Sequence, residues 1–127
     1  MINKDMTQSY KTKEYSIDAS GKPVGRLATE IAVVLNGKNS VNFVRNVTPE
    51  VKVKVINANK VKITGNHKID QSLHKRYSGY PGGLTLTTWR DISEKKGFGE
   101  IIKHAVSGML PKNKLRDIKM KNLSVEE

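Results

Sequence analysis

Two stretches of the chain repeat apolar residues at helical spacing. In the first, they recur at intervals of three and four residues: Leu27, Ala28, Ile31, Ala32 and Leu35. This is the period of a helix with one buried face, and Asn36-Gly37 predicts where that helix ends. The second stretch gives the strongest helical signal in the sequence, with Gly108 and Pro111 at its end: Phe98, Ile101, Ile102, Ala105, Val106 and Met109.

Two shorter signals predict further helices near the C-terminal end. Thr88-Trp89-Arg90-Asp91 resembles a capping box in which Asp replaces Glu or Gln, so a helix should begin after Thr88. Leu115 and Ile118 predict a short basic helix.

The remaining apolar positions form strand-like patterns. Val51–Ile56 alternates strictly between apolar and charged residues before becoming continuous, which predicts a strand with one buried face. Tyr15–Ala19, Val61–Thr64 and Leu84–Thr87 are shorter predicted strands, whereas Asn66–Tyr77 fits either a strand or an extended arm. The order strand, helix, strand, strand, helix predicts an α/β sandwich with at least one parallel crossover.

Length and composition favour one globular domain. The 127 residues correspond to a single typical domain, which we expect over residues 15–125, after a polar N-terminal tail over residues 1–14. The tail has no apolar region of the kind found in signal peptides and contains no Arg. The chain contains no cysteine, which excludes a disulfide scaffold, a cysteine-ligated zinc site and a cysteine nucleophile.

The charge balance indicates the class of partner. Lys and Arg number 23 against 12 Asp and Glu, a net charge of +11. The segment 36–90 holds ten basic residues and only two acidic ones, and the segment 103–121 holds six and one. A solvated surface normally mixes the two signs, so these one-sided blocks favour contact with a polyanion such as a nucleic acid.

The connection Gly21–Arg26 lies where a nucleotide-phosphate loop would be found, between a strand and a helix. It lacks the P-loop pattern, because three residues rather than four separate Gly21 and Gly25, and Arg26-Leu27 replaces Lys-Ser/Thr. Nucleotide binding is therefore disfavoured. Two interpretations stay open: a tight connection only, or a site where Lys22, Arg26 and free helix amides hold one nucleic-acid phosphate.

The glycine-rich segment Lys75–Gly83 is the second candidate site. Lys75 and Arg76 supply positive charge, and Tyr77 or Tyr80 can stack on a base or a sugar. We expect the glycines to allow close backbone approach to a partner, rather than to serve folding. The alternative is a plain turn between two strands.

The segment Met109–Lys114 is the third candidate. We expect Met109 and Leu110 in the core and the following lysines on nucleic-acid phosphates, with a solvated surface as the alternative. His67, His74 and His104 lack metal-ligand spacing, and we expect His104 to be structural. The sparse acidic residues do not pair as general acid and base would need, so neither an enzyme nor a cofactor or metal site is expected.

Six motifs, taken in chain order, resemble those of one protein family. They are Asp18–Thr29, Leu35–Lys38, Val55–Ala58, Lys62–Asn66, Tyr77–Gly83 and Ala105–Lys112. Together they are similar to the bacterial-type family of large-subunit ribosomal protein thirteen, over residues 15–125. The chain departs from the family pattern at Arg45–Glu50, which looks shortened and lacks an acidic, glycine-containing segment. It also departs at Arg116-Asp117, where the family has Gly-Arg, and in its short C-terminal tail.

The resemblance implies a three-layer α/β/α sandwich around a mostly parallel four-stranded sheet. It also implies a cytoplasmic structural constituent of the large ribosomal subunit that binds ribosomal RNA, contacts neighbouring ribosomal proteins and acts in early assembly and in translation. No membrane or small-molecule substrate is expected. Combined with the charge pattern, it gives these expected RNA-binding residues: Lys22, Arg26, Gly37, Lys38, Lys68, Lys75, Arg76, Tyr77, Gly79, Tyr80, Gly82, Gly83, Lys112, Lys114, Arg116 and Lys119.

Two other functions remain open from the sequence. A free-standing RNA- or DNA-binding regulator of the same fold would share the basic blocks but would not co-sediment with large ribosomal subunits. A phosphate-handling enzyme would bind nucleotides, which calorimetry would detect.

Overall fold

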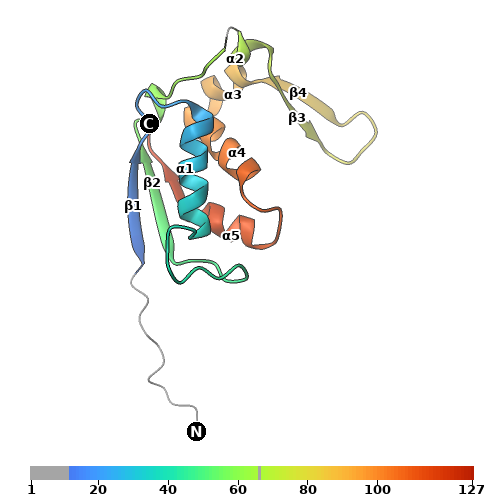
Figure 1. Ribbon diagram of the computed structural model, residues 1–127. Helices are drawn as coiled ribbons and strands as arrows, with labels where there is room; N and C mark the ends of the chain where they lie inside the picture. The colour runs from blue at the N-terminus through green and yellow to red at the C-terminus, as the bar shows by residue number, and fades with distance from the viewer. Residues whose placement is uncertain (1–11, 66) are drawn as a thin grey trace.

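The computed structural model describes residues 12–65 and 67–127. Most of the expected N-terminal tail, and Asn66 of one family motif, lie outside the described residues. The elements in chain order are β1 (Lys13–Asp18), α1 (Val24–Asn36), β2 (Val51–Ile56), the 3-10 turn η2 (Ala58–Lys60), α2 (Lys68–Gln71), β3 (Leu73–Tyr77), β4 (Leu84–Thr88), α3 (Trp89–Lys96), α4 (Phe98–Met109), α5 (Leu115–Lys121) and β5 (Leu123–Val125) (Figure 1).

The main sheet is parallel, with the strand order β1-β2-β5. Strand β1 begins at Lys13, two residues earlier than predicted, and its Ile17 lies opposite Val55 of β2. Val55 in turn lies opposite Val125 of β5. Because α1 joins the parallel strands β1 and β2, the predicted parallel crossover is confirmed.

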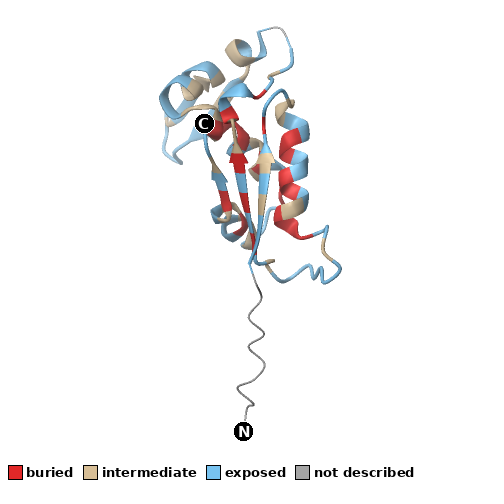
Figure 2. Ribbon diagram, turned by 90° about the vertical axis from the view of Figure 1, so that its left-hand side faces the viewer, coloured by how far each residue is buried: buried red, intermediate tan, exposed pale blue. Residues whose placement is uncertain are grey.

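The hydrophobic core lies between this sheet and the helices on one of its faces. Val51, Val53 and Val55 are buried, whereas Lys52 and Lys54 between them are exposed. The buried valines meet Leu27 and Ile31 of α1, together with residues of α4 such as Ile102 and Val106. Helices α1 and α4 stand on the same side of the three strands (Figure 1), and the burial colours change from residue to residue along β2 (Figure 2).

The mixed α/β class is confirmed, but the sheet is smaller than expected. In the described part of the chain the parallel sheet has three strands, and the predicted strand Val61–Thr64 is reduced to one parallel bridge between Pro23 and Lys62. The chain then turns at Gly65, whose φ is 110°. Lys52, Lys54 and Ser16, on the sheet face away from α1, are exposed, so the described residues place no second helical layer there.

The helix ends follow local signals that the sequence contains. Gly37 adopts the left-handed conformation with φ 76°, and its N–H bonds to carbonyls of the last turn of α1, as predicted from Asn36-Gly37. Thr88 caps α3 by accepting a 3.2 Å hydrogen bond from the backbone N–H of Asp91. Leu110 is buried as expected, but Met109 is 44% exposed and the expectation that it lies in the core is wrong.

Strands β3 and β4 form a separate antiparallel hairpin that extends away from the helices (Figure 1). Leu73 lies opposite Thr88, and Tyr77 lies opposite Leu84. The hairpin contacts the body through the His74 ring, whose centroid lies 5.1 Å from that of Trp89 and 4.9 Å from that of His104. Within the described ranges, no helix has the length and apolar character needed to cross a membrane.

Candidate nucleic-acid interface

The tip of the hairpin is built by glycines whose conformations the turn itself requires. Gly79 and Gly82 have φ values of 88° and 73°, which side-chain-bearing residues rarely adopt. A Cβ on Gly83 would overlap the hydroxyl of Ser78. The Gly83 N–H donates to the Tyr80 carbonyl at 3.0 Å and so closes the turn. The expectation that these glycines serve contact rather than folding is therefore wrong, because the turn cannot form this way without them.

The side chains around this tip are well placed for a large anionic partner. Tyr80 is 76% exposed and Tyr77 is 64% exposed, and both Lys75 and Arg76 are exposed. No acidic residue occurs between Ser72 and Thr88. The strand register places Lys75 and Tyr77 on one face of the hairpin and Arg76 on the other. The hairpin therefore offers cations on both faces and aromatic rings near its tip.

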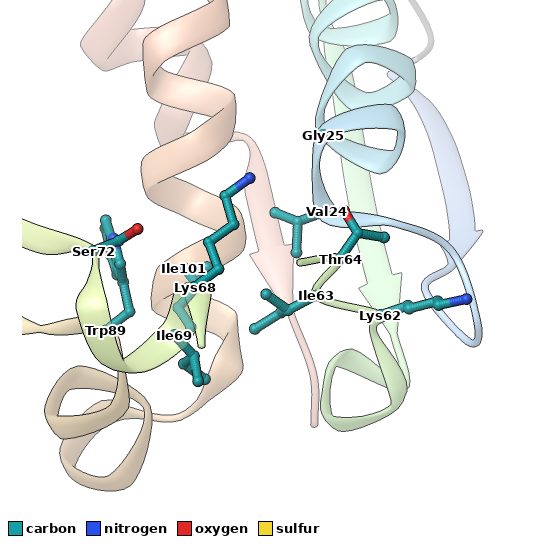
Figure 3. A pocket seen from close by; sticks show the side chains of 10 residues that line it. All are labelled: Val24, Gly25, Lys62, Ile63, Thr64, Lys68, Ile69, Ser72, Trp89 and Ile101. Carbon is teal, nitrogen blue, oxygen red and sulfur yellow. The ribbon is translucent and has the colours of Figure 1, made fainter. Parts of the chain in front are cut away.

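The start of α1 borders a mostly apolar cavity of about 220 Å³ (Figure 3). Pro23 has no N–H to offer, and the Val24 N–H donates to the Lys62 carbonyl at 3.2 Å. Lys22 forms an ion pair of 2.8 Å with Glu30, whereas Arg26 is exposed. The amine of Lys68 extends toward the space between α1 and α4, while that of Lys62 points away from it (Figure 3). Of the expected cations near this helix start, Arg26 and Lys68 are thus the more available.

The expected contacts near the C-terminal helix divide into accessible and inaccessible residues. Lys112 and Lys114 are exposed in the loop before α5, and Arg116 is half-buried. Lys119 is only 4% exposed, and its ammonium donates a 2.9 Å hydrogen bond to Asn36 Oδ1. Burial lowers the pKa of Lys119 from its ordinary value. The structure therefore corrects the expectation that Lys119 binds RNA, because its charge is held inside the protein.

The corner after α1 shows the same division. Gly37 is buried, and a Cβ there would come within 3.0 Å of Pro49 Cβ. Its role is to end α1, so the expectation of an RNA contact at Gly37 is corrected as well. Lys38, the next residue, is exposed and remains accessible.

A cluster of three aromatic rings next to the hairpin was not predicted from the sequence. His74, Trp89 and His104 come from β3, α3 and α4, and the Trp89 and His104 ring centroids lie 4.9 Å apart. His104 is exposed at the surface, and partial desolvation of its ring lowers its pKa; the charge of His74 lowers this pKa further, while Glu100 raises it. His74 and His104 lie 30 positions apart in the sequence, so no short spacing indicated that their side chains would meet. No group of three or more potential metal ligands occurs among the described residues.

The accessible cations have the chemistry of a surface that binds a polyanion. They lie at the hairpin, at the Lys38 corner, at the start of α1 and in the loop before α5, and most have no acidic neighbour in sequence. Basic side chains presented in this way contact phosphates, while exposed tyrosines can contact bases or sugars.

Comparison with known proteins gives a consistent match over nearly the whole described chain. A family profile described as "Ribosomal protein L13" matches residues 12–126. The chain is 50% identical over 113 residues to the "Large ribosomal subunit protein uL13" of Clostridioides difficile (strain 630), covering 89% of this chain and 78% of that protein. It is 42% identical over 127 residues to the protein of the same name from Prochlorococcus marinus (strain MIT 9301), covering 98% of this chain and 87% of the relative.

Proposed function

The chain belongs to the ribosomal protein L13 family, and from this premise we propose how it binds within the large ribosomal subunit. The protein is a structural constituent of that subunit in the cytoplasm and takes part in translation. It is not an enzyme, since the family is a non-enzymatic component of the ribosome. A free-standing regulator is not supported, because the relatives carry the names of large-subunit proteins.

The proposed RNA-binding surface consists of the expected residues that are accessible in the structure. Most of these residues are exposed, and the hairpin segment from Ser72 to Thr88 contains no acidic residue; both observations support the proposal. Lys22 takes part if RNA displaces its exposed partner Glu30, since such surface ion pairs are weak. The other members are Arg26, Lys38, Lys68, Lys75, Arg76, Tyr77, Gly79, Tyr80, Gly82, Gly83, Lys112, Lys114 and Arg116.

The proposal also includes the finer architecture that the family resemblance implies. Residues 15–125 act as one domain that joins the subunit early and contacts both ribosomal RNA and neighbouring ribosomal proteins. The fourth strand of the implied sheet would be Val61–Thr64, and the single parallel bridge between Pro23 and Lys62 supports this part of the proposal. The single observation that carries the function is the family match over residues 12–126.

A sucrose gradient tests this function directly. The protein, tagged and expressed at its natural level, should co-migrate with large subunits at close to one copy per particle. Basic proteins also adhere non-specifically, so the gradient is repeated after washes of increasing salt, with resident ribosomal proteins as the internal standard. Loss of the protein at salt concentrations that leave those proteins bound would overturn the proposal.

A further inference from the structure

The β3–β4 hairpin has the reverse of the usual amphipathic arrangement. Side chains alternate between the two faces of a strand, and the register pairs Lys75 with Leu86 and Arg76 with Thr85. One face therefore carries the polar residues His74, Arg76, Thr85 and Thr87. The other, which we call the outer face, carries Leu73, Lys75, Tyr77, Leu84, Leu86 and Thr88.

The polar face is the one that the hairpin turns toward its own protein. His74 contacts Trp89 and His104, and all four polar residues of this face border a cavity of about 210 Å³ with α3 and α4. The hairpin thus meets the body through its polar side, and the described residues of this chain leave its apolar side largely uncovered.

The outer face exposes four large apolar side chains side by side. Leu73 is 47% exposed, Leu86 48%, Leu84 57% and Tyr77 64%. Contiguous apolar surface of this kind marks interaction sites in soluble proteins. A two-stranded ribbon is also marginally stable by itself and gains stability when one face is packed.

We propose that the outer face docks onto a neighbouring protein of the large subunit, at an apolar patch of that protein edged by carboxylates. This inference rests on the proposed function, because it needs the protein to be in the subunit. Three leucines gain most from an apolar partner surface. Charge complementarity supplies the carboxylates, since Lys75 is a cation on the outer face and the hairpin contains no acidic residue.

Charge and chemistry argue against two other partners for the outer face, a second copy of this chain and RNA. A second copy would bring another chain of net charge +11 and would place one Lys75 near the other. RNA presents phosphates, riboses and base faces. Tyr77 at the tip end of the outer face can stack on a base, but Leu73, Leu84 and Leu86 offer RNA neither a hydrogen bond nor an aromatic plane. Lys75 fits both proposals, because its methylene stem can pack with the leucines while its ammonium reaches the rim of the docked patch, where it can meet a carboxylate or an RNA phosphate.

A photocrosslinking experiment in assembled subunits tests this docking. Benzoylphenylalanine replaces Leu86 in the full chain, and large subunits are purified through a gradient and irradiated. The expected product is an adduct with one large-subunit protein, whose crosslinked peptide contains apolar residues and at least one Asp or Glu. The same probe in place of Thr85, which points to the opposite face, is the matched control and should not give that adduct.

A double variant provides the second measurement. Leu84→Thr with Leu86→Thr should leave the melting temperature of the free protein nearly unchanged, since both side chains are exposed. It should lower retention of the crosslinked neighbour after a salt wash by about tenfold. Val44→Thr with Val47→Thr, which changes exposed apolar residues outside the hairpin, should not lower it.

The outcomes separate this inference from the proposed function. In one set of outcomes, the protein co-migrates with large subunits while the probe at position 86 crosslinks to RNA, crosslinks to a second copy or gives no adduct. Any of these three results would overturn the docking proposal but leave the proposed function standing. A protein that fails to co-migrate would overturn the proposed function itself, and the docking proposal with it.

Discussion

The ammonium of Lys119 in α5 donates a 2.9 Å hydrogen bond to the side-chain oxygen of Asn36, the last residue of α1. Both residues are buried, with 4% and 8% of their surfaces exposed. Their meeting point is the C-terminal end of α1, where the partial negative charge of a helix favours a cation. The bond therefore links α5 to α1 and explains how a lysine is accommodated inside the protein.

Lys119→Met should destabilise the protein. Methionine keeps most of the side-chain length but leaves the buried Asn36 oxygen without its donor, which costs about 1–3 kcal/mol. Thermal unfolding measures the change, and Ile118→Thr is the control, since Ile118 is the adjacent residue and is 48% exposed. A stability loss no larger than that of the control would contradict a structural role for the buried bond.

Ile102→Asp should unfold the domain rather than weaken RNA binding selectively. Ile102 is fully buried in the core cluster, and an unpaired carboxylate there costs several kcal/mol. Total stability is commonly about 5–15 kcal/mol, so we expect loss of cooperative unfolding in calorimetry. Ile102→Val should retain a cooperative transition at a lower temperature. An Ile102→Asp protein that melts like the wild type would show that this stripe does not form the core face.

The elements that the sequence predicted well are those with a local cause. Each of these signals lies within a short segment: the apolar stripes of α1 and α4, the alternation of Val51–Ile56, and the helix caps at Gly37 and Thr88. The Leu84–Thr87 strand and the helix after Leu115 were also found. In each of these elements the residue pattern and the backbone hydrogen bonds belong to the same short segment.

The features that were missed depend on segments far apart in the chain. Within α5, Lys119 is buried and Ile118 is 48% exposed, the opposite of what hydrophobicity alone suggests. The reason is Asn36, 83 positions earlier. Strand β5 is only three residues long and exists because β2 offers it a partner. The Asn36-Gly37 motif predicted the end of α1 correctly, but it did not predict that Gly37 is buried against Pro49.

Acidification should reduce stability through His104. Partial desolvation of the surface-exposed His104 ring lowers its pKa in the folded protein, with a further contribution from the charge of His74, so the unfolded chain binds more protons. The contribution of neutral His104 to the stability of the fold is complete above the pKa of the unfolded chain, about 6.5. It is lost as the pH falls through the lowered pKa of the folded protein. The drop in melting temperature between about pH 7.5 and about pH 5.5 should be smaller in His104→Phe than in the wild type.

His67→Gln is the control for this pH prediction, because His67 lies outside the His74–Trp89–His104 cluster. It should show the same pH dependence as the wild type. An unchanged pH dependence in His104→Phe would mean that other groups cause the loss of stability in acid.

Gly82→Val should disturb the hairpin turn. Gly82 has φ 73°, and a residue with a Cβ costs about 1–2 kcal/mol in this left-handed region, with more expected for a β-branched one. Hydrogen exchange at the Gly83 N–H, which donates to the Tyr80 carbonyl, should become faster. Gly108→Ala is the control, since Gly108 has open space around it and lies in α4, where alanine is favoured. If the Gly83 N–H were equally protected from hydrogen exchange in both variants, the turn would tolerate a side chain at position 82.

Lys75→Ala combined with Arg76→Ala should weaken RNA binding without changing the fold. Both side chains are exposed, and exposed charges contribute little to stability, so the melting temperature should stay the same. Loss of two phosphate contacts should slow incorporation into large subunits in a competition with the wild type. It should also make the salt dependence of binding to ribosomal RNA shallower by about one to two in log–log slope.

The double variant Lys95→Ala with Lys96→Ala separates position from total charge. It removes the same two charges from the end of α3, outside the proposed RNA-binding residues. If the hairpin binds phosphates directly, this control should incorporate faster than the Lys75 and Arg76 variant and keep a salt slope nearer to that of the wild type. Identical behaviour of the two variants would mean that the net charge of +11, rather than the hairpin, drives association. The loop around Lys112 and Lys114 would then be the better candidate for the specific contact, because its lysines are equally exposed.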